Sequence, residues 1–203
     1  KKMANKESSF LNMVLTLGAV TLFAATALGL IYELTEEPIA RAKKAKKMEA
    51  IREVLPGFNN NPDDNKKAYQ VGEDSVKIYM AEMDDNTVGY AVETFTNQGY
   101  SGKIRIMVGF LPNGEINDIS VIQHQETPGL GSKIEKGKSD FIDQFIGKDP
   151  SEFNLEVKKN GGDVDAITAA TITSRAFCDA VKRAHEMLKE EGLKENISEH
   201  EVR

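Results

Sequence analysis

The sequence has 203 residues, enough for one domain with an appendage and too few for two full domains. Its 26 Lys and Arg against 32 Asp and Glu give a net charge of −6, which argues against nucleic acid as a partner. The single cysteine, Cys178, excludes an internal disulfide and a cysteine-based zinc or iron–sulfur site within this chain. The three histidines share no metal-ligand spacing, so no metal site is predicted.

The first element along the chain is an apolar run that predicts a membrane anchor over residues 1–32. Phe10–Tyr32 carries no charged side chain and spans about 35 Å as a helix, more than the ~30 Å hydrocarbon core of a bilayer. The alternative is a cleaved secretory signal peptide, with lysines before the run and Ala25-Thr26-Ala27 as its cleavage site. The run exceeds the roughly 7–15 residues of a signal-peptide core, which favours a permanent anchor in the lipid bilayer.

The charges that flank the anchor leave its orientation open. Lysines precede the apolar run, and a larger basic group follows it between Arg41 and Lys47, so the positive-inside count favours a cytoplasmic C-terminal domain. Long domains, however, translocate largely regardless of charge.

Residues 33–67 are expected to form a juxtamembrane helix and linker. Pro38 suits the first turn of a helix that runs to about Leu55, and Pro56-Gly57 ends it. Residues 59–67 are polar and are predicted to be a loop, which places the start of the soluble domain at residue 68.

Residues 68–190 are predicted to form a small α+β domain with an antiparallel sheet and flanking helices. Residues rich in β-formers predict strands over 76–80, 88–95, 103–111 and 116–122, with a hairpin turn at 112–115. Ser139–Phe145 is predicted to be a short amphipathic helix, and Phe153–Val157 a further strand. An apolar stripe over Ala176–Leu188 predicts the last helix, capped by Thr173 or Ser174 and ended before Gly192, with a charged tail over 191–203.

Two segments are candidates for chemistry. Asp163–Ser174 places hydroxyls between small residues immediately before a helix, where free N–H groups and the helix dipole favour a phosphate. Composition alone favours the simpler interpretation, an N-terminal cap with alanines packed in the core. The loop Glu126–Gly131 (ETPGLG), after His124, is either a turn shaped for a flat ligand or an ordinary connection. His124 itself is expected to be a satisfied histidine rather than a catalytic base.

At both segments the sequence resembles the FMN-binding domain family. Thr168-Ala169-Ala170-Thr171 is similar to the [S/T]-G-A-T flavinylation motif, and Gln98–Ile134 resembles the family's hairpin and ETPGLG pattern. The T-x-x-P-I-A run of Thr35–Ala40 after the anchor fits as well. These domains occur in the G subunit of the Rnf electron-transport complex and in the C subunit of the sodium-pumping NADH:quinone oxidoreductase. The compact length favours the Rnf member.

The resemblance implies a membrane-anchored electron carrier of an ion-translocating ferredoxin:NAD⁺ oxidoreductase, with no catalytic residue of its own. Thr171 would carry FMN through a phosphoester, with Thr168, Ala169, Ala170 and Thr173 beside it. The flavin-contacting residues of relatives match Glu126, Thr127, Leu130 and Gly131. A flavin transferase would attach FMN outside the cytoplasm, so the N-terminus would be cytoplasmic and the domain periplasmic or extracytoplasmic. The other components of the Rnf complex would be its partners in the plasma membrane.

One residue departs from the family pattern, because Ala169 stands where the motif has glycine. If the backbone there requires a positive φ, alanine would cost on the order of 1 kcal/mol. A membrane-anchored binding module without redox chemistry remains an alternative, with the threonine motif as a mere helix cap. A hydrolase with a threonine nucleophile lacks a partnered base.

Overall fold

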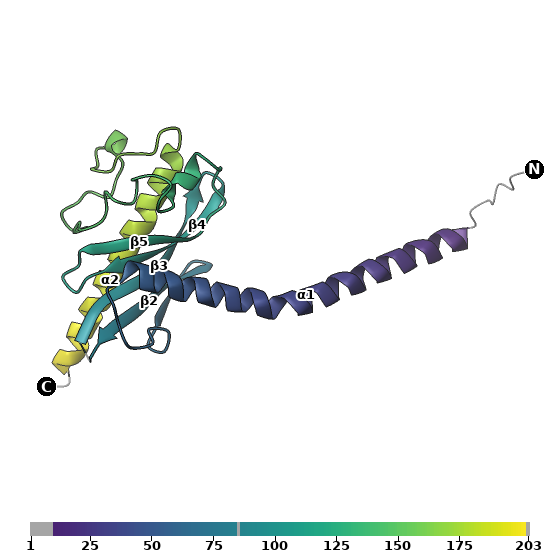
Figure 1. Cartoon of the computed structure of the whole chain (residues 1–203), viewed down its shortest axis with the longest axis horizontal. Helices are drawn as coiled ribbons and strands as arrows, with labels where there is room; N and C mark the ends of the chain where they lie inside the picture. Colours follow the sequence, from purple (N-terminus) through teal and green to yellow (C-terminus); the bar gives the residue numbers. More distant parts are fainter. Residues whose placement is uncertain (1–9, 85, 202–203) are drawn as a thin grey trace, which may run out of the picture. The chain divides into compact units, whose positions relative to one another are not determined.

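The computed structural model describes residues 10–84 and 86–201, with side chains described up to residue 192. It divides the chain into two compact units, residues 1–45 and residues 46–203. The N-terminal segment predicted before Phe10 lies outside the described residues. Figure 1 shows the order of the elements along the chain.

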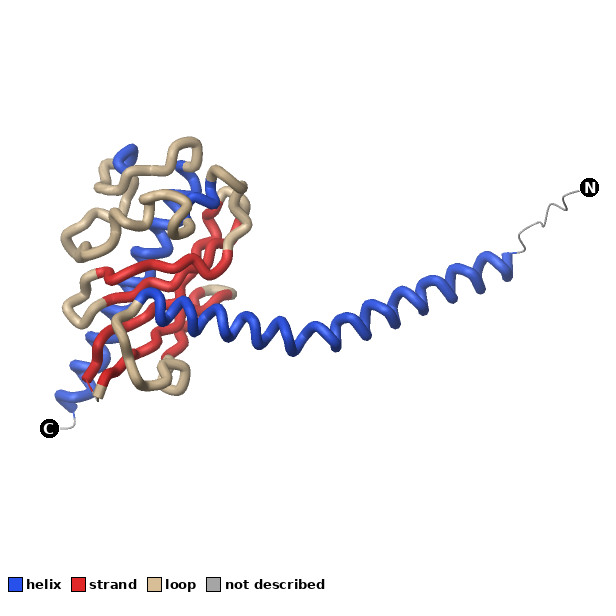
Figure 2. The backbone as a smooth tube through the Cα atoms, viewed as in Figure 1, coloured by secondary structure: helices blue, strands red, loops and turns tan. Residues whose placement is uncertain are grey.

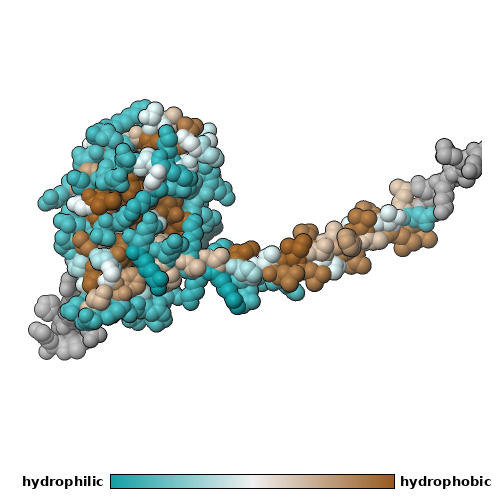
Figure 3. Space-filling model, in the orientation of Figure 1, coloured by the Kyte–Doolittle hydropathy of each residue, from teal (hydrophilic) through white to brown (hydrophobic). Residues whose placement is uncertain are grey.

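The unit before residue 46 consists of the greater part of α1, a helix that spans Phe10–Val54. Its first half is long and apolar enough to cross a membrane, and none of that window is buried within the protein. In Figure 3 the apolar side chains form an almost continuous band along it. The hydroxyls of Thr16, Thr21 and Thr26 donate to carbonyls four residues earlier, at 2.7–2.9 Å, which satisfies them without water.

The predicted break between the anchor and a second helix at Pro38 is wrong. Pro38 lies inside α1 instead of at the start of a new helix. A proline inside a helix removes one backbone hydrogen bond without preventing the helix from continuing on both sides. Because proline is common in the first turn of a helix, the sequence alone predicts a new helix that starts at Pro38.

The second unit is built on one antiparallel sheet in the order β1-β2-β3-β4-β5 (Figure 2). The strands are β1 (Lys67–Val71), β2 (Asp74–Met83), β3 (Asn86–Gly99), β4 (Gly102–Phe110) and β5 (Ile116–Gln123). The antiparallel sheet and the hairpin between β4 and β5 are confirmed, and β1, which directly follows the polar stretch 59–67, was not predicted. The second unit also includes Lys46–Leu55. That the cofactor-binding part begins at residue 68 stays a prediction.

Each face of the sheet is covered by a helix. The helix α2 (Thr171–Glu201) packs on one face, where Phe177 and Val181 join the apolar side chains of β3 and β4. The last turns of α1 cover the other face through Ile51, Val54 and Leu55. The backbone of α1 comes so close that a Cβ on Gly109 of β4 would clash with the Val54 carbonyl oxygen.

The long connection between β5 and α2 contains only two short 3₁₀ turns, η1 (Gly131–Ile134) and η2 (Lys158–Asn160). The predicted helix over 139–145 is a series of turns, and the predicted strand over 153–157 is reduced to one bridge between Val157 and Val164. The apolar residues that suggested these elements are buried nonetheless: Phe141 packs edge-on and Phe145 tilted against Phe177, with ring centroids 5.2 and 5.4 Å from that of Phe177.

Both predicted ends of the last helix are also wrong. The helix α2 begins at Thr171, so Thr173 and Ser174 lie in its first turn rather than at a cap. It continues past Gly192 to Glu201, since a glycine can lie within a helix at a cost of about 1 kcal/mol. The N-terminus of α2 therefore lies directly at the threonine motif.

Candidate functional site

The hydroxyl groups around the first turn of α2 differ in their hydrogen-bond partners. Thr173 and Ser174 are buried, and both are bonded within the protein. The Thr173 hydroxyl donates to Glu126 Oε2 at 2.5 Å. Ser174 Oγ donates to the Ala170 carbonyl and accepts from the Ile167 N–H, both at 3.0 Å. Both hydroxyl hydrogens are therefore already donated within the protein.

Thr171 is the hydroxyl that remains for chemistry. It is half-buried, it is the first residue of α2, and within the described part of the chain its side chain makes no hydrogen bond. The first intrahelical bond near it runs from Ser174 N to the Ala170 carbonyl, so the N–H groups of Thr171–Thr173 have no intrahelical partner. Free N–H groups and the positive end of the helix dipole both favour an anion beside Thr171.

A cavity of about 490 Å³ opens beside Thr171. It is lined by Tyr100, Glu126, Thr127, Leu130, Gly131, Ala169, Ala170, Thr171, Ile172 and Thr173. The fold thus brings together the two segments that the sequence singled out, although Glu126 and Thr173 are 47 residues apart in the chain. Thr168 does not line this cavity; it is exposed and borders a different one, beside Lys133 and Ser139.

Glu126 fixes the loop that forms one wall of the cavity. Its carboxylate is buried and accepts from the Ser101 N–H at 2.9 Å and from the Thr173 hydroxyl. The contact is close enough that a Cβ on Gly131 would lie 2.7–2.9 Å from Glu126 and Thr173 atoms. Glu126 therefore ties the turn between β3 and β4, its own loop and α2 to one another.

Tyr100 and Ile172 line the cavity but were not predicted as site residues. Tyr100 is 69% exposed and Ile172 49% exposed, and Leu130 beside them is 43% exposed. Tyr100 lies within the stretch Gln98–Ile134 that carried the resemblance, so its place in the turn after β3 was the available signal. Together the three side chains present an uncovered apolar and aromatic surface around the cavity.

Ala169, which stands where the related motif has glycine, has a positive φ. Its φ is +61°, in the left-handed region where a side chain is strained. The Ala170 N–H that follows donates to the Ile167 carbonyl at 2.9 Å, closing the tight turn that leads into α2. The turn therefore requires a positive φ at residue 169, and alanine adopts it at a cost.

Comparison with known proteins decides the family. Residues 99–186 match the FMN-binding domain. A protein of Haemophilus influenzae strain PittEE, named as the G subunit of an ion-translocating oxidoreductase complex, is 40% identical over 196 residues, which cover 90% of this chain and 92% of the relative. The chain belongs to this G-subunit family. The protein of the same name from Escherichia coli K12 is 39% identical over 81% of this chain and 85% of its own length. The corresponding protein of Shewanella baltica is 34% identical over 81% and 84%.

The residues of this G-subunit family member fit FMN on the geometry of the cavity itself. The free hydroxyl of Thr171 at a helix N-terminus suits the phosphate. The exposed surface of Tyr100, Leu130 and Ile172 suits a flat aromatic ring system, which would cover apolar groups that otherwise face water. The FMN-binding domain therefore contains a cavity with chemistry for both ends of the cofactor.

Proposed function

We propose that this chain is the electron-carrying subunit of an ion-translocating oxidoreductase complex, with FMN joined to Thr171 through a phosphoester. The observation that carries the proposal is the hydroxyl of Thr171, which borders the cavity without a hydrogen-bond partner among the described residues. Its neighbours Thr173 and Ser174 are already committed to Glu126, Ile167 and Ala170. Membership of the G-subunit family supports the same assignment.

The protein's own part is to bind and orient the cofactor. Thr171 would hold the phosphate, and the N–H groups of the first turn of α2 would stabilise its charge. Glu126 holds the loop Thr127–Gly131 against α2, which keeps the cavity walls together. FMN when bound accepts and gives up electrons, and a link through the phosphate leaves its ring system chemically unchanged. No side chain of this chain is needed as an acid, base or nucleophile during electron transfer.

The apolar part of α1 anchors this carrier in the plasma membrane under the same proposal. The N-terminus would be cytoplasmic and the domain extracytoplasmic, where a flavin transferase attaches FMN. The other components of the Rnf complex would supply and remove the electrons in a ferredoxin:NAD⁺ oxidoreductase whose pumped ion is Na⁺ or H⁺. The named relatives favour this assignment over the C subunit of the quinone oxidoreductase.

The test is flavin fluorescence that survives denaturation. The full chain is co-expressed with its transferase, denatured, and run on a gel under ultraviolet light. We expect a fluorescent band for the wild type and for Thr168→Val, and a dark band for Thr171→Val, which keeps the side-chain shape and removes only the hydroxyl. A dark wild-type band would instead support the membrane-anchored binding module without redox chemistry.

A further inference from the structure

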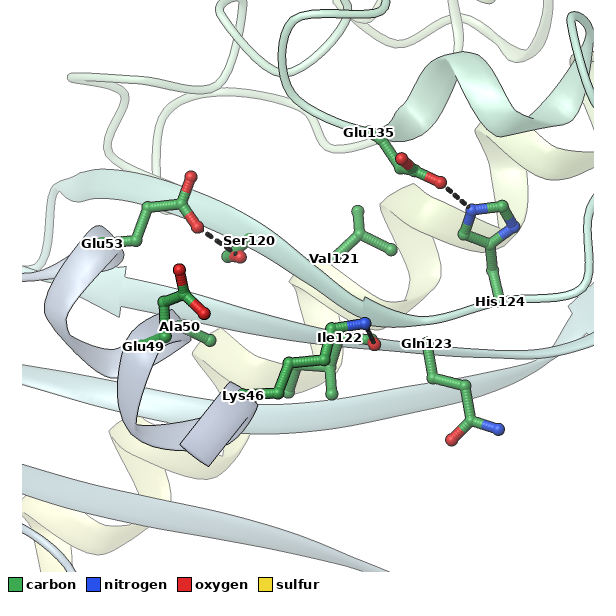
Figure 4. Close-up of a pocket in the computed structure, with 10 residues that line it drawn as sticks. All are labelled: Lys46, Glu49, Ala50, Glu53, Ser120, Val121, Ile122, Gln123, His124 and Glu135. Carbon is green, nitrogen blue, oxygen red and sulfur yellow. Dashed lines mark hydrogen bonds and ion pairs between the residues drawn. The ribbon is translucent and has the colours of Figure 1, made fainter. Parts of the chain in front are cut away.

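His124 lies between the end of β5 and the loop that lines the flavin cavity. Its ring borders a separate cavity of about 450 Å³ that residues of β5, the last turns of α1 and Glu135 also line. Figure 4 shows these side chains, with the His124 ring turned toward Glu135. Its side chain is only 13% exposed. One ring nitrogen, Nδ1, accepts from the backbone N–H of Glu126 at 3.0 Å, and the other, Nε2, contacts the Glu135 carboxylate. Both ring nitrogens are therefore engaged.

These contacts require the neutral imidazole with its proton on Nε2. Nδ1 faces an N–H donor and needs its lone pair, while Nε2 faces a carboxylate and needs a hydrogen. An imidazolium has no lone pair on Nδ1, so it would place two N–H groups against each other. The contact with Glu126 is therefore compatible with one protonation state alone.

The charged groups around His124 come from three elements. Glu135 follows η1 and also pairs with Lys138, and hydrogen bonds from Lys138 and His124 hold the pKa of the Glu135 carboxyl below its ordinary value. Lys46, Glu49 and Glu53 of α1 line the same cavity. Lys136 pairs with Asp118 of β5 and lies 3.9 Å from Glu53. Carboxylates outnumber the cations among these groups.

The residue that His124 holds is the one that orders the flavin cavity. The backbone N–H of Glu126 bonds to His124, and the carboxylate of the same residue bonds to Ser101 and Thr173. Gly131, at the far end of the loop, packs against that carboxylate. A shift of the Glu126 backbone would therefore also move its carboxylate, which lines the cavity.

We propose that neutral His124 is a positioning residue for the loop Glu126–Gly131, and that protonation of its Nδ1 breaks the bond to the Glu126 N–H, places a positive charge beside the loop and so adds to the pH dependence that the flavin's potential has on its own. The proposal rests on the proposed function for its consequence at the flavin. The hydrogen bond and its loss on protonation involve only His124 and Glu126, and they do not depend on a bound flavin.

Two substitutions separate the two ring nitrogens. Asparagine carries its side-chain oxygen near the position of Nδ1 and accepts readily from the N–H two residues ahead, so His124→Asn keeps the bond to Glu126 at every pH. Glutamine reaches the position of Nε2, so His124→Gln keeps the contact with Glu135 and loses the bond to Glu126. Neither the asparagine nor the glutamine side chain at position 124 titrates between about pH 5 and 8, where histidines change charge, and the other histidines are common to all the proteins compared.

The first experiment measures hydrogen exchange of the loop peptide around Glu126 in the full detergent-solubilised chain, on a Thr171→Val background that carries no covalent flavin. Variants are compared at equal pH, so the intrinsic pH dependence of exchange cancels. At pH 8 we expect His124→Asn to match the parent protein and His124→Gln to exchange about five- to tenfold faster, because one hydrogen bond is lost. At pH 5.5 the parent should exchange as fast as His124→Gln.

Equal exchange of the parent and His124→Asn at both pH values would overturn the proposal, and so would unaltered exchange in His124→Gln at pH 8. Because this arm needs no flavin, it gives a result even if Thr171 carries none.

The second experiment measures the midpoint potential of the flavin in matured protein. A positive charge on His124 favours an added electron, so the wild-type potential should rise above that of His124→Asn as the pH falls from 8 to 5.5. A gap between the two proteins that stays constant with pH would overturn the link to the flavin. If no flavin is attached to the wild type, the proposed function fails while the exchange result for His124 still stands.

Discussion

At the scale of single residues, the strain at Ala169 shows what the glycine of the related motif provides. A positive φ is available to glycine at no steric cost, whereas in alanine it brings the Cβ too close to the following carbonyl oxygen. The turn persists because Ser174, Thr173 and Glu126 fix the residues on either side of it. This chain thus keeps the geometry of the motif without its glycine.

Ala169→Gly should stabilise the protein by about 1 kcal/mol, because it removes the left-handed strain. The matched control is Ala170→Gly, at a buried residue without a positive φ, which should destabilise it by about 1 kcal/mol. Urea unfolding of the full chain in detergent measures both. A loss of stability in Ala169→Gly equal to that in the control would contradict the strain.

Cys178 gives a prediction in which pH acts through burial. Burial raises the pKa of its thiol from an ordinary value of 9.0 to about 12. A folded pKa above the unfolded one means that stability is intact below pH 9 and falls as the pH rises toward 12. Between pH 8 and 10.5 we expect the wild type to lose about 2 kcal/mol more than Cys178→Ala in urea unfolding. Equal losses would show that the thiol does not contribute.

The proposed attachment residue, Thr171, was predicted from the sequence only through resemblance. The residues themselves offered Thr168, Thr171, Thr173 and Ser174 without a means of choosing between them. The choice depends on partners such as Glu126, 47 residues away, which spacing within the motif cannot reveal. Thr171 differs from Thr173 and Ser174 because its hydroxyl makes no hydrogen bond among the described residues. Only the folded structure reveals this difference.

At the scale of elements, the end of α1 packs as part of the domain and is not only a linker to the apolar segment. Ile51, Val54 and Leu55 cover the face of the sheet opposite α2. Asn117 of β5 donates to the Val54 carbonyl at 2.8 Å, and Ser120 donates to Glu53 at 2.6 Å. The last turns of α1 therefore hold β5, the strand that leads into the loop Glu126–Gly131.

Gly109→Ala tests this contact, since its Cβ would clash with the Val54 carbonyl oxygen. We expect a loss of about 2 kcal/mol or more in the free energy of unfolding, because the helix end must move off β4. Gly57→Ala is the control: its Cβ would meet one methionine carbon at an ordinary 3.8 Å, and its effect should stay within about 0.5 kcal/mol. Similar stabilities of the two variants would show that the helix end is not packed tightly.

Elements with a strong local pattern were the predictable ones. The alternating apolar residues of β4 and β5 and the Pro112–Glu115 turn fixed that hairpin. Phe141 and Phe145 also had the spacing of a helix, yet they fill the core from irregular turns. Their backbone is set by contact with Phe177 of α2, and local propensity does not register such long-range packing.

At the scale of the whole molecule, the chain combines an apolar helix with an acidic domain. Residues 1–55 hold 9 basic and 6 acidic side chains, and the remaining residues hold 17 and 26, so the net charges are +3 and −9. Charge alone therefore leaves the orientation open, since the basic residues lie on both sides of the apolar run. The proposed flavin transfer outside the cytoplasm requires the domain on the outer side of the membrane.

Cysteine labelling tests the orientation. Cys178 is buried and provides little background, so Lys182→Cys adds one exposed thiol to the same helix. A membrane-impermeant maleimide applied to intact spheroplasts should label Lys182→Cys and leave the wild type unlabelled, while a cytosolic marker protein confirms that the membrane is sealed. Labelling that needs prior lysis would place the domain in the cytoplasm.

The mass of one peptide from the matured protein decides whether Thr171 carries the flavin. Trypsin cleaves after Lys159 and Arg175, which releases residues 160–175 with Thr168, Thr171, Thr173 and Ser174 together. We predict that this peptide carries the added mass of FMN less one water and that fragmentation places the addition on Thr171. An unmodified peptide, or an addition on another of these hydroxyls, would contradict the proposed attachment.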